Sequence, residues 1–320
     1  MKLIVQIPCL NEEATLPQTI ADIPRQIPGV DQVEILVIDD GSTDRTVEIA
    51  RRLGARVLRN RRNLGLAYTF RRGLDHCLEA GADIVVNTDG DNQYAGADIP
   101  KLIAPILAGT ADIVVGDRQT QEIAHFSPVK KFLQWLGSGV VQRLADARVP
   151  DTVCGFRAIS REAALQLNIV SKFSYTTEMV IQAGRRRLAM TSVPIRVNPV
   201  TRESRLFQST LHFVARSLST MLRTYAMYQP LRMFMYIGTV LTLLGTVPIL
   251  RFLYFWLIGD GAGHIQSLLL GGAFLVMGFV TYLIGLVADL IAVNRQLLEL
   301  TLERVRRADL ARPSSEPRDR

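Results

Sequence analysis

The chain of 320 residues has little cysteine: it contains three, Cys9, Cys77 and Cys154, which are far apart and odd in number. Disulfide frameworks use even sets of cysteines and zinc sites use closely spaced ones, so neither is indicated. A reducing cytosol is therefore the expected surroundings of the soluble part.

Aromatic residues are also few, at 7%. They do not alternate with basic residues in the way that is typical of proteins that bind single-stranded nucleic acids. The net charge of +7 fits nucleic acid or an anionic membrane surface. The basic residues gather beside two long apolar segments, which favours the membrane, and we expect no nucleic-acid partner. They are Arg202, Arg205, Arg216, Arg223, Arg232, Arg295, Arg304, Arg306 and Arg307.

The N-terminal sequence MKLIVQIPCLNEE has no long apolar run and reaches polar residues too early for a signal peptide, so we expect a first strand there. From there to about residue 200, short β-branched runs alternate with amphipathic segments such as Thr43–Leu53 and Leu66–Ala80. The expected strands are Leu3–Ile7, Val33–Ile38, Ala55–Leu58, Ile84–Asn87, Ile113–Val115 and Val193–Val197. This alternation predicts an α/β, Rossmann-like domain with a mostly parallel sheet flanked by helices. Continuous apolar runs agree with burial on both faces.

Two apolar segments, Met233–Ile258 and Leu268–Val293, are long enough to cross a bilayer as helices. The loop between them, GDGAGHIQS, has no Lys or Arg, whereas both outer flanks are rich in Arg. The positive-inside rule then places both termini and the soluble domain in the cytoplasm. We expect a multi-pass protein of the cytoplasmic membrane.

Between the soluble domain and these segments, Leu206–Tyr228 has apolar residues at helical spacing. Such a helix either packs on the domain or lies amphipathically on the membrane interface, where it could also serve contacts in a homo-oligomer. The expected organisation is a catalytic domain at 1–205, interfacial helices at 206–231, two transmembrane helices at 232–294 and a basic, partly disordered cytoplasmic tail at 295–320.

Acidic residues follow two of the expected strands. Asp89 and Asp91 stand one residue apart in NTDGDNQY, and Asp39 ends the run in VIDDGSTDRT. A D-x-D pair taken alone fits a solvated acidic turn as well as a site for a divalent cation. Because parallel sheets bind ligands at the carboxyl ends of their strands, two acidic strand ends together indicate a site for a nucleotide diphosphate.

The remaining polar motifs each keep two interpretations. Pro8, Asn11 and Glu12 either stop the first strand and cap the next helix, or form a loop beneath a nucleotide. The NRRNLG segment is a plain loop-to-helix junction or an anion site at a helix N-terminus. The arginines of VVGDR, DTVCGFR and VPIRVNPVTRES are each expected at the surface when taken singly, whereas together they favour a substrate that carries phosphate.

Seven motifs, IPCLNEE, VIDDGSTDRT, NLGLAYTFRRGL, NTDGDNQY, VVGDR, DTVCGFR and VPIRVNPVTRES, occur in the order seen in inverting family 2 glycosyltransferases of the GT-A fold. The chain most resembles the dolichyl- and polyprenyl-phosphate sugar synthases, over roughly residues 1–295. Two departures stand out: D-G-D replaces the frequent D-A-D, and RESRLF replaces a Gly-Ser-Lys-like segment, which leaves the roles of Ser204 and Arg205 open.

The resemblance implies roles for matching residues. A divalent cation, Mg²⁺ or Mn²⁺, would bind Asp89 and Asp91. The nucleotide-sugar donor would contact Pro8, Asn11, Glu12, Asp39, Asp89 and Arg202. The catalytic residues would be Asp91, Gln93 and Arg118, and the acceptor phosphate would meet Arg118, Lys130 and Lys131.

The expected reaction moves one sugar from a UDP- or GDP-linked donor to a polyprenyl phosphate, with inversion. The acceptor phosphate is already ionised near neutral pH, so a protein base is not required, although Asp91 could still act as one. A glycosyltransferase with another lipid or polysaccharide acceptor, or a non-catalytic membrane scaffold, would also fit the sequence. A polysaccharide synthase is disfavoured because QAGRR lacks the Trp of its signature, and a pyrophosphorylase because PCLNEE is not a Gly-rich loop.

Overall fold

The computed structural model describes residues 1–119, 139, 142, 149–169, 175–199, 223, 226–259 and 261–311. The chain divides into two compact units. The first comprises Met1–Val214 and Leu302–Arg320, and the second comprises Ala215–Thr301. The predicted site residues Lys130, Lys131 and Arg202 lie outside the described residues, as does most of the predicted interfacial helix at 206–228.

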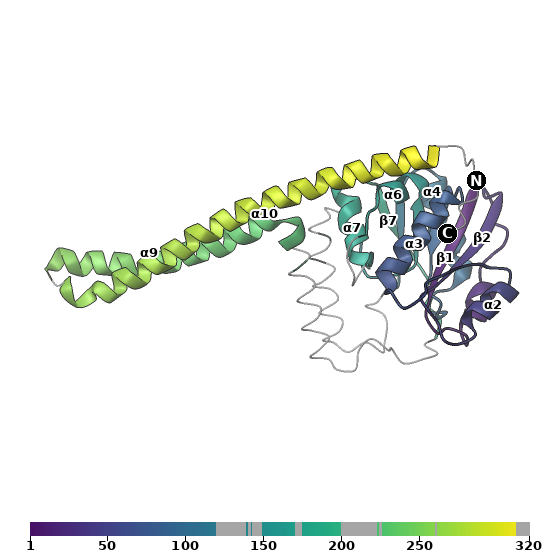
Figure 1. Ribbon diagram of the computed structural model, residues 1–320, viewed down its shortest axis with the longest axis horizontal. Helices are drawn as coiled ribbons and strands as arrows, with labels where there is room; N and C mark the ends of the chain where they lie inside the picture. Colours follow the sequence, from purple (N-terminus) through teal and green to yellow (C-terminus); the bar gives the residue numbers. More distant parts are fainter. Residues whose placement is uncertain are drawn as a thin grey trace. The chain divides into compact units, whose positions relative to one another are not determined.

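A sheet of seven strands forms the centre of the first unit, in the order β3-β2-β1-β4-β6-β5-β7. Figure 1 shows β1 and β2 side by side in this sheet, with helices such as α3 beside it. The strands are β1 (Lys2–Cys9), β2 (Gln32–Asp39), β3 (Arg56–Arg59), β4 (Ile84–Asn87), β5 (Ile113–Asp117), β6 (Arg157–Ser160) and β7 (Met190–Pro194). All neighbouring pairs are parallel except those of β6, which runs antiparallel to both β4 and β5. The predicted mostly parallel α/β sheet is confirmed.

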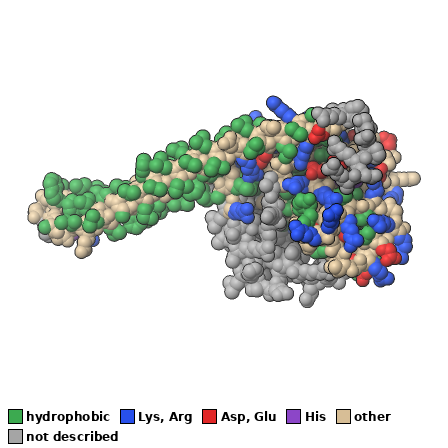
Figure 2. Space-filling view, in the orientation of Figure 1, with side chains coloured by type: hydrophobic (Ala, Val, Ile, Leu, Met, Phe, Trp, Pro, Cys, Tyr) green, Lys and Arg blue, Asp and Glu red, His purple; other side chains and the backbone are tan. Residues whose placement is uncertain are grey.

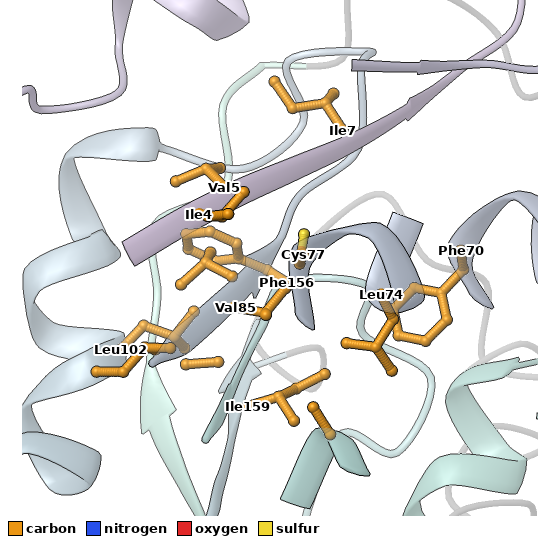
Figure 3. Packing of buried hydrophobic residues seen from close by; sticks show 14 of the residues in the cluster. Ile4, Val5, Ile7, Phe70, Leu74, Cys77, Val85, Leu102, Phe156 and Ile159 are labelled. Carbon is orange, nitrogen blue, oxygen red and sulfur yellow. The ribbon is translucent and has the colours of Figure 1, made fainter. Parts of the chain in front are cut away.

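The middle of the sheet is covered on both faces. Every residue of β4 is buried, as is every residue of β1 after Lys2, because helices pack on each side of these strands. Helix α3 (Leu66–Glu79) packs on β1 and β2 and also contacts α6 (Arg161–Gln166) and α7 (Tyr175–Arg185). Figure 3 shows side chains of the core, among them Ile4, Leu74 and Phe156. This burial is why continuous apolar runs predicted these strands correctly.

The remaining helices in the described part of this unit are short. They are α1 (Leu16–Ala21), α2 (Thr46–Arg52), the 3₁₀ turn η1 (Gly96–Asp98) and α4 (Ile99–Leu107), which packs on β5 and β6. Helix α6 begins after Ser160, whose Oγ accepts a hydrogen bond from the Ala163 N–H at 3.2 Å. Such a side-chain cap satisfies one of the N–H groups that a helix start leaves free.

Two strand predictions differ from the structure. Strand β6 was not predicted, because its sequence RAIS has only two apolar residues, Ala158 and Ile159, and no continuous apolar run. Strand β7 covers Met190–Pro194 rather than the predicted Val193–Val197. It is an edge strand with no fully buried residue, so its pairing with β5 does not depend on an apolar run.

The last turns of the long helix α10 (Ile265–Ala311) belong to the first unit. Arg306 donates to the Leu167 carbonyl at 2.8 Å and pairs with Asp75 of α3 at 3.1 Å. Arg186 pairs with Glu303 at 2.6 Å, and Arg307 pairs with Glu162. These contacts fasten the end of α10 to the sides of α3, α6 and α7.

The second unit contains α9 (Pro230–Ile258), the turn η2 (Ala262–His264) and the first part of α10. Both helices are long and apolar enough to cross a membrane, as predicted. Hydrophobic side chains dominate their surfaces in Figure 2.

Glycines at intervals of seven residues mark the contact between α9 and α10: Gly238 and Gly245 on the first, Gly271, Gly278 and Gly285 on the second. A Cβ atom at any of these five positions would approach the partner helix to 2.8 Å or less. The absence of side chains therefore lets the two backbones pack closely.

Candidate active site

Most of the predicted site motifs in the described residues lie at one edge of the sheet. Strands β1, β2 and β4 are parallel neighbours, so the end of β2 at Asp39 lies at the same edge as the segments that follow β1 and β4 and contain Asn11 and Asp89. Strand β5 points the same way, because β6 is antiparallel to both β4 and β5. Arg118 therefore leaves the sheet at this edge, and the chain returns there at Asp151, shortly before β6 begins.

The segment after β1 is tied to the segment after β2 through hydrogen bonds of its backbone and of Asn11. The Asn11 N–H donates to Ser42 Oγ at 2.9 Å, and Asn11 Oδ1 accepts from the Thr43 N–H at 2.8 Å. The Glu12 N–H donates to Thr46 Oγ1 at 2.9 Å. Pro8, expected to stop the strand, lies inside β1 and pairs with Ile38. It is tolerated there because β4 pairs with β1 only over Leu3–Gln6, so Pro8 lies beyond that ladder.

The two aspartates at the end of β2, Asp39 and Asp40, accept hydrogen bonds from different segments of the chain. Asp39 is fully buried and accepts hydrogen bonds from the Ser42 N–H at 3.2 Å and from Arg59 Nε at 3.1 Å. Asp40 accepts from Asn60 Nδ2 and from the N–H groups of residues 64 and 65, all at 2.8–2.9 Å. Asp40 thus fixes the loop that leads into α3, whereas the role of Asp39 in donor binding stays a prediction.

The D-G-D turn follows β4. Asp91 Oδ1 accepts a hydrogen bond from the Gln93 N–H at 3.1 Å, and Thr15 Oγ1 donates to the Gly90 carbonyl at 2.8 Å. Burial, and next the nearby charge of Asp91, raise the pKa of Asp89 to about 7. The turn therefore holds two carboxylates whose joint ionisation is unfavourable unless a positive charge is close.

This pair fits a divalent cation. Carboxylate oxygens are the ligands that Mg²⁺ and Mn²⁺ prefer, and a bound cation offsets the repulsion that opposes ionisation of Asp89. Within the described ranges no group of three His, Cys, Asp or Glu residues is placed to hold a metal. Two carboxylates completed by phosphate oxygens and water are a common arrangement for Mg²⁺, so Asp89 and Asp91 suit a cation that arrives with a nucleotide diphosphate.

Arg118 forms a bidentate ion pair with Asp151. Arg118 Nε lies 2.6 Å from Asp151 Oδ2, and Arg118 Nη2 lies 3.0 Å from Asp151 Oδ1. Burial alone would lower the pKa of Arg118, but the hydrogen bonds to Asp151 raise it, so the guanidinium stays charged. Its Nη1 makes no hydrogen bond within the described part of the chain. Sequence reasoning had assigned no role to Asp151.

Further polar residues missed by the sequence analysis hold the loop between Asp151 and β6. The Gly155 N–H donates to the Tyr94 hydroxyl at 3.1 Å. Asn87 Nδ2 donates to the Gly155 carbonyl at 2.9 Å and to the Tyr175 hydroxyl at 3.0 Å. The Tyr94 ring stacks on Phe156 with 5.5 Å between centroids. None of these residue types signals a site in the sequence, because their roles depend on contacts across 61–88 positions.

The expectation that each arginine taken singly lies at the surface is wrong for Arg157. Its side chain is fully buried, and it is among the largest fully buried side chains of the described residues. Burial lowers the pKa of Arg157, and its N–H groups donate to backbone carbonyls. Hydrogen bonds of this kind offset part of the cost of burying a guanidinium. They depend on carbonyls that only the fold brings near Arg157, so the sequence pattern alone could not predict that it is buried.

The chain beyond β7 runs along the D-G-D turn. The Asn198 N–H donates to the Gln93 carbonyl at 2.9 Å, and Asn198 Nδ2 donates to the Asn92 carbonyl at 3.0 Å. A pocket of about 590 Å³ adjoins this contact, and Asp22 and Arg196 are among its lining residues. Gln93 is therefore held from both sides.

The sequence model of glycosyl transferase family 2 matches residues 4–167. A dolichyl-phosphate hexose transferase of Haloferax volcanii is 31% identical over 194 residues, with 60% of this chain and 81% of that protein covered. An undecaprenyl-phosphate mannosyltransferase of Micrococcus luteus is 26% identical over 206 residues, with 61% of this chain and 83% of that protein covered.

Among solved structures, the first unit resembles glucosyl-3-phosphoglycerate synthase from Mycobacterium tuberculosis, crystallised with Mn²⁺, UDP-glucose and phosphoglyceric acid. The TM-score is 0.55 at 25% identity, with 70% of this chain and 79% of that chain covered. A crystal of the same enzyme contains Mg²⁺ and UDP. A fold similar to that of this chain is therefore found in an enzyme that was crystallised with a divalent cation and a nucleotide.

Proposed function

This chain belongs to glycosyl transferase family 2, and we propose that it moves one sugar from a UDP- or GDP-linked donor to a polyprenyl phosphate at a membrane surface. The observation that carries the proposal is the meeting of the D-G-D turn and the Arg118–Asp151 pair at one edge of the sheet, in a chain that also has two membrane-length apolar helices. The donor and the acceptor of this reaction both carry phosphate. A cation at the D-G-D turn would meet the donor diphosphate, and the guanidinium of Arg118 would meet the acceptor phosphate.

The donor side is formed by the ends of β1, β2 and β4. The donor diphosphate would approach the turn of Asp89 and Asp91, and the nucleoside would lie against Asn11, Glu12 and Asp39. A divalent cation held by the two aspartates, Mg²⁺ or Mn²⁺, would offset the charge that develops on the leaving nucleoside diphosphate. Arg202 is proposed to contact the same diphosphate by its match to the family motif.

The acceptor side is formed by Arg118, with Lys130 and Lys131 as further proposed contacts. A phosphate monoester is ionised near neutral pH, so the chain needs to orient the nucleophile rather than remove a proton from it. Arg118 is suited to this task because Asp151 fixes two of its nitrogens and leaves Nη1 to bind an anion. Direct attack on the face opposite the leaving diphosphate would invert the anomeric carbon.

The apolar helices favour a lipid acceptor over a soluble one. Each helix exceeds the 20 or so residues that span a bilayer, and few of their residues are buried within the described chain. The two relatives described above are named for undecaprenyl and dolichyl phosphates, which are lipids of this kind. We propose a cytoplasmic-membrane enzyme with its catalytic unit and both termini in the cytoplasm.

The test is transfer from radiolabelled UDP-glucose, UDP-N-acetylglucosamine and GDP-mannose to undecaprenyl phosphate by the full chain in detergent. A parallel reaction offers 3-phosphoglycerate, because phosphoglyceric acid accompanies the similar solved enzyme. We expect a labelled lipid product with one donor, lost with EDTA and restored by Mg²⁺ or Mn²⁺.

The matched variants are Asp91→Asn and Glu79→Gln, the latter an exposed carboxylate at the end of α3. Asp91→Asn should lower transfer by on the order of 10³-fold while the protein stays folded, whereas Glu79→Gln should leave it unchanged. Full activity of Asp91→Asn would refute the metal-binding role. A product with 3-phosphoglycerate and none with the lipid would refute the polyprenyl-phosphate acceptor.

A further inference from the structure

Arg157 is a buried cation whose observed partners are all backbone oxygens. Its Nε donates to the Cys154 carbonyl at 2.7 Å, its Nη1 to the Thr176 carbonyl at 2.7 Å and its Nη2 to the Thr152 carbonyl at 2.6 Å. It takes part in none of the ion pairs found among the described residues. Burying a guanidinium costs free energy that these hydrogen bonds offset only in part. An apolar side chain would fill the same space in the core at a lower cost, so stability alone does not explain Arg157.

Two of the three carbonyls belong to the loop that joins Asp151 to β6, and the third lies at the start of α7. Arg157, the first residue of β6, therefore holds the backbone of this loop and connects it to the start of α7. A lysine could not replace it in kind, since a single ammonium nitrogen cannot reach three carbonyls arranged around a planar fork.

The clamped loop touches both halves of the proposed site. At one end, Asp151 holds Arg118 through two hydrogen bonds. At the other end, Gly155 lies so close to Asp89 that a Cβ atom there would be 2.8 Å from Asp89 Oδ2. One loop thus sets the position of the residue proposed to bind the acceptor phosphate and of one proposed metal ligand.

From this geometry we propose that Arg157 is a positioning residue, which aligns Asp89 and Arg118 with each other by fixing the backbone of residues 151–156. The proposal rests on the proposed function for the meaning of that alignment. Arg157 itself touches no substrate in this arrangement.

Arg161 provides a matched control at the opposite end of the same strand. Like Arg157 it donates to backbone carbonyls, those of Leu78 at 3.3 Å and Ala82 at 3.0 Å. It follows β6 directly, at the edge of the sheet away from the site. Arg161→Lys therefore reports what the loss of such backbone contacts does to folding alone.

The experiment measures Mn²⁺ binding to the full chain in detergent by electron paramagnetic resonance, with UDP and with GDP present, beside the kinetic constants for transfer. Arg157→Lys should weaken Mn²⁺ binding by about tenfold and raise the KM for the lipid acceptor, as expected when a residue that orients a ligand is lost. Arg161→Lys should leave both within about twofold while its thermal stability changes.

Val153→Gly keeps the proposal testable if Arg157→Lys does not fold. Val153 is exposed and lies between the two loop carbonyls that Arg157 holds, so glycine there loosens the loop without emptying the core. We expect it to weaken Mn²⁺ binding in the same direction. Unchanged Mn²⁺ binding in a folded Arg157→Lys, or in Val153→Gly when Arg157→Lys is unfolded, would overturn the proposal. If both variants weaken Mn²⁺ binding but the wild-type chain transfers no sugar to undecaprenyl phosphate, the proposed function is refuted and the positioning role of Arg157 is not.

Discussion

Gly155 and Asp89 are in contact across the candidate site, and no larger residue fits between the loop and the carboxylate. A Cβ atom at position 155 would lie 2.8 Å from Asp89 Oδ2, 3.1 Å from Asp89 Oδ1 and 3.2 Å from the Tyr175 hydroxyl. The backbone at this glycine is not in the left-handed region, so the restriction comes from the carboxylate and not from backbone strain.

Gly155→Ala should therefore displace Asp89 by a few tenths of an ångström and lower the transfer rate by about 10–100-fold, because small errors in the position of a ligand are costly. Gly272→Ala is the control, since a Cβ atom at position 272 meets nothing within 4 Å. Steady-state transfer and thermal unfolding of both variants check this. Wild-type activity in Gly155→Ala would show that Asp89 tolerates displacement.

Arg306 should stabilise the first unit. Arg306→Ala removes the pair with Asp75 and the hydrogen bond to the Leu167 carbonyl, and we expect a loss of about 1–2 kcal/mol in the free energy of unfolding. Arg304→Ala is the matched control because Arg304 is exposed and forms no ion pair within the described chain. Equal melting temperatures of the two variants would mean that the contacts of Arg306 contribute nothing to the stability of this unit.

Asp75 should respond to pH in the opposite sense to a typical salt-bridged carboxylate. Burial raises the pKa of Asp75 above its ordinary 3.8, and the charge of Arg306 only partly counters that rise. A raised pKa means that the folded state holds the proton more tightly than the unfolded state does. The stability that this proton contributes is therefore complete below pH 3.8 and is lost as the pH rises through the folded-state pKa.

Asp75→Asn should accordingly match the wild type in acid and exceed its stability at neutral pH by a fraction of a kcal/mol, since the site is partly exposed. Thermal unfolding between about pH 3.5, just below the ordinary pKa, and about pH 7.5 checks this. A variant less stable than the wild type at pH 7 would show that attraction to Arg306 outweighs the cost of burial.

The apolar hairpin should depend on its glycines. A Cβ atom at Gly278 would lie 2.7 Å from Thr242 Oγ1, so Gly278→Ile forces α9 and α10 apart and should destabilise their packing by about 1–3 kcal/mol. Gly272→Ile adds the same side chain where no atom lies within 4 Å, and it should leave the melting temperature in detergent unchanged. Similar losses in both variants would attribute the effect to helix propensity instead.

The sequence predicted the parts of the fold that depend on burial from two sides. Strands β1, β2, β4 and β5 appear as apolar runs because both of their faces are covered in their buried portions. Strand β6 was not predicted because RAIS has no apolar run, and the burial of Arg157 depends on carbonyls that only the folded chain brings close. No local pattern contains that information.

The candidate site shows the same division. Asp39, Asp89 and Asp91 were proposed because two acidic strand ends occur on one chain, and Arg118 was proposed from its match to a family motif. Their roles stay predictions. Asp151, Asn87 and Tyr94 were not proposed, because each acts on a partner distant in sequence, as Asp151 does on Arg118 33 positions away. Their residue types are ordinary, and only their location gives them a role.

The reversal of β6 has a consequence for how such an enzyme can change its acceptor. In an all-parallel sheet each crossover begins at the ligand-binding edge and ends at the opposite one. Here β5 leaves the sheet at Arg118 and β6 enters it after Asp151, so the intervening segment begins and ends on the same side as the D-G-D turn. The residues that flank this segment, Arg118 and Asp151, are joined by their ion pair. An exchange of residues 120–148 would therefore enter and leave the fold at this one pair, and the strand register on the D-G-D side would not have to change.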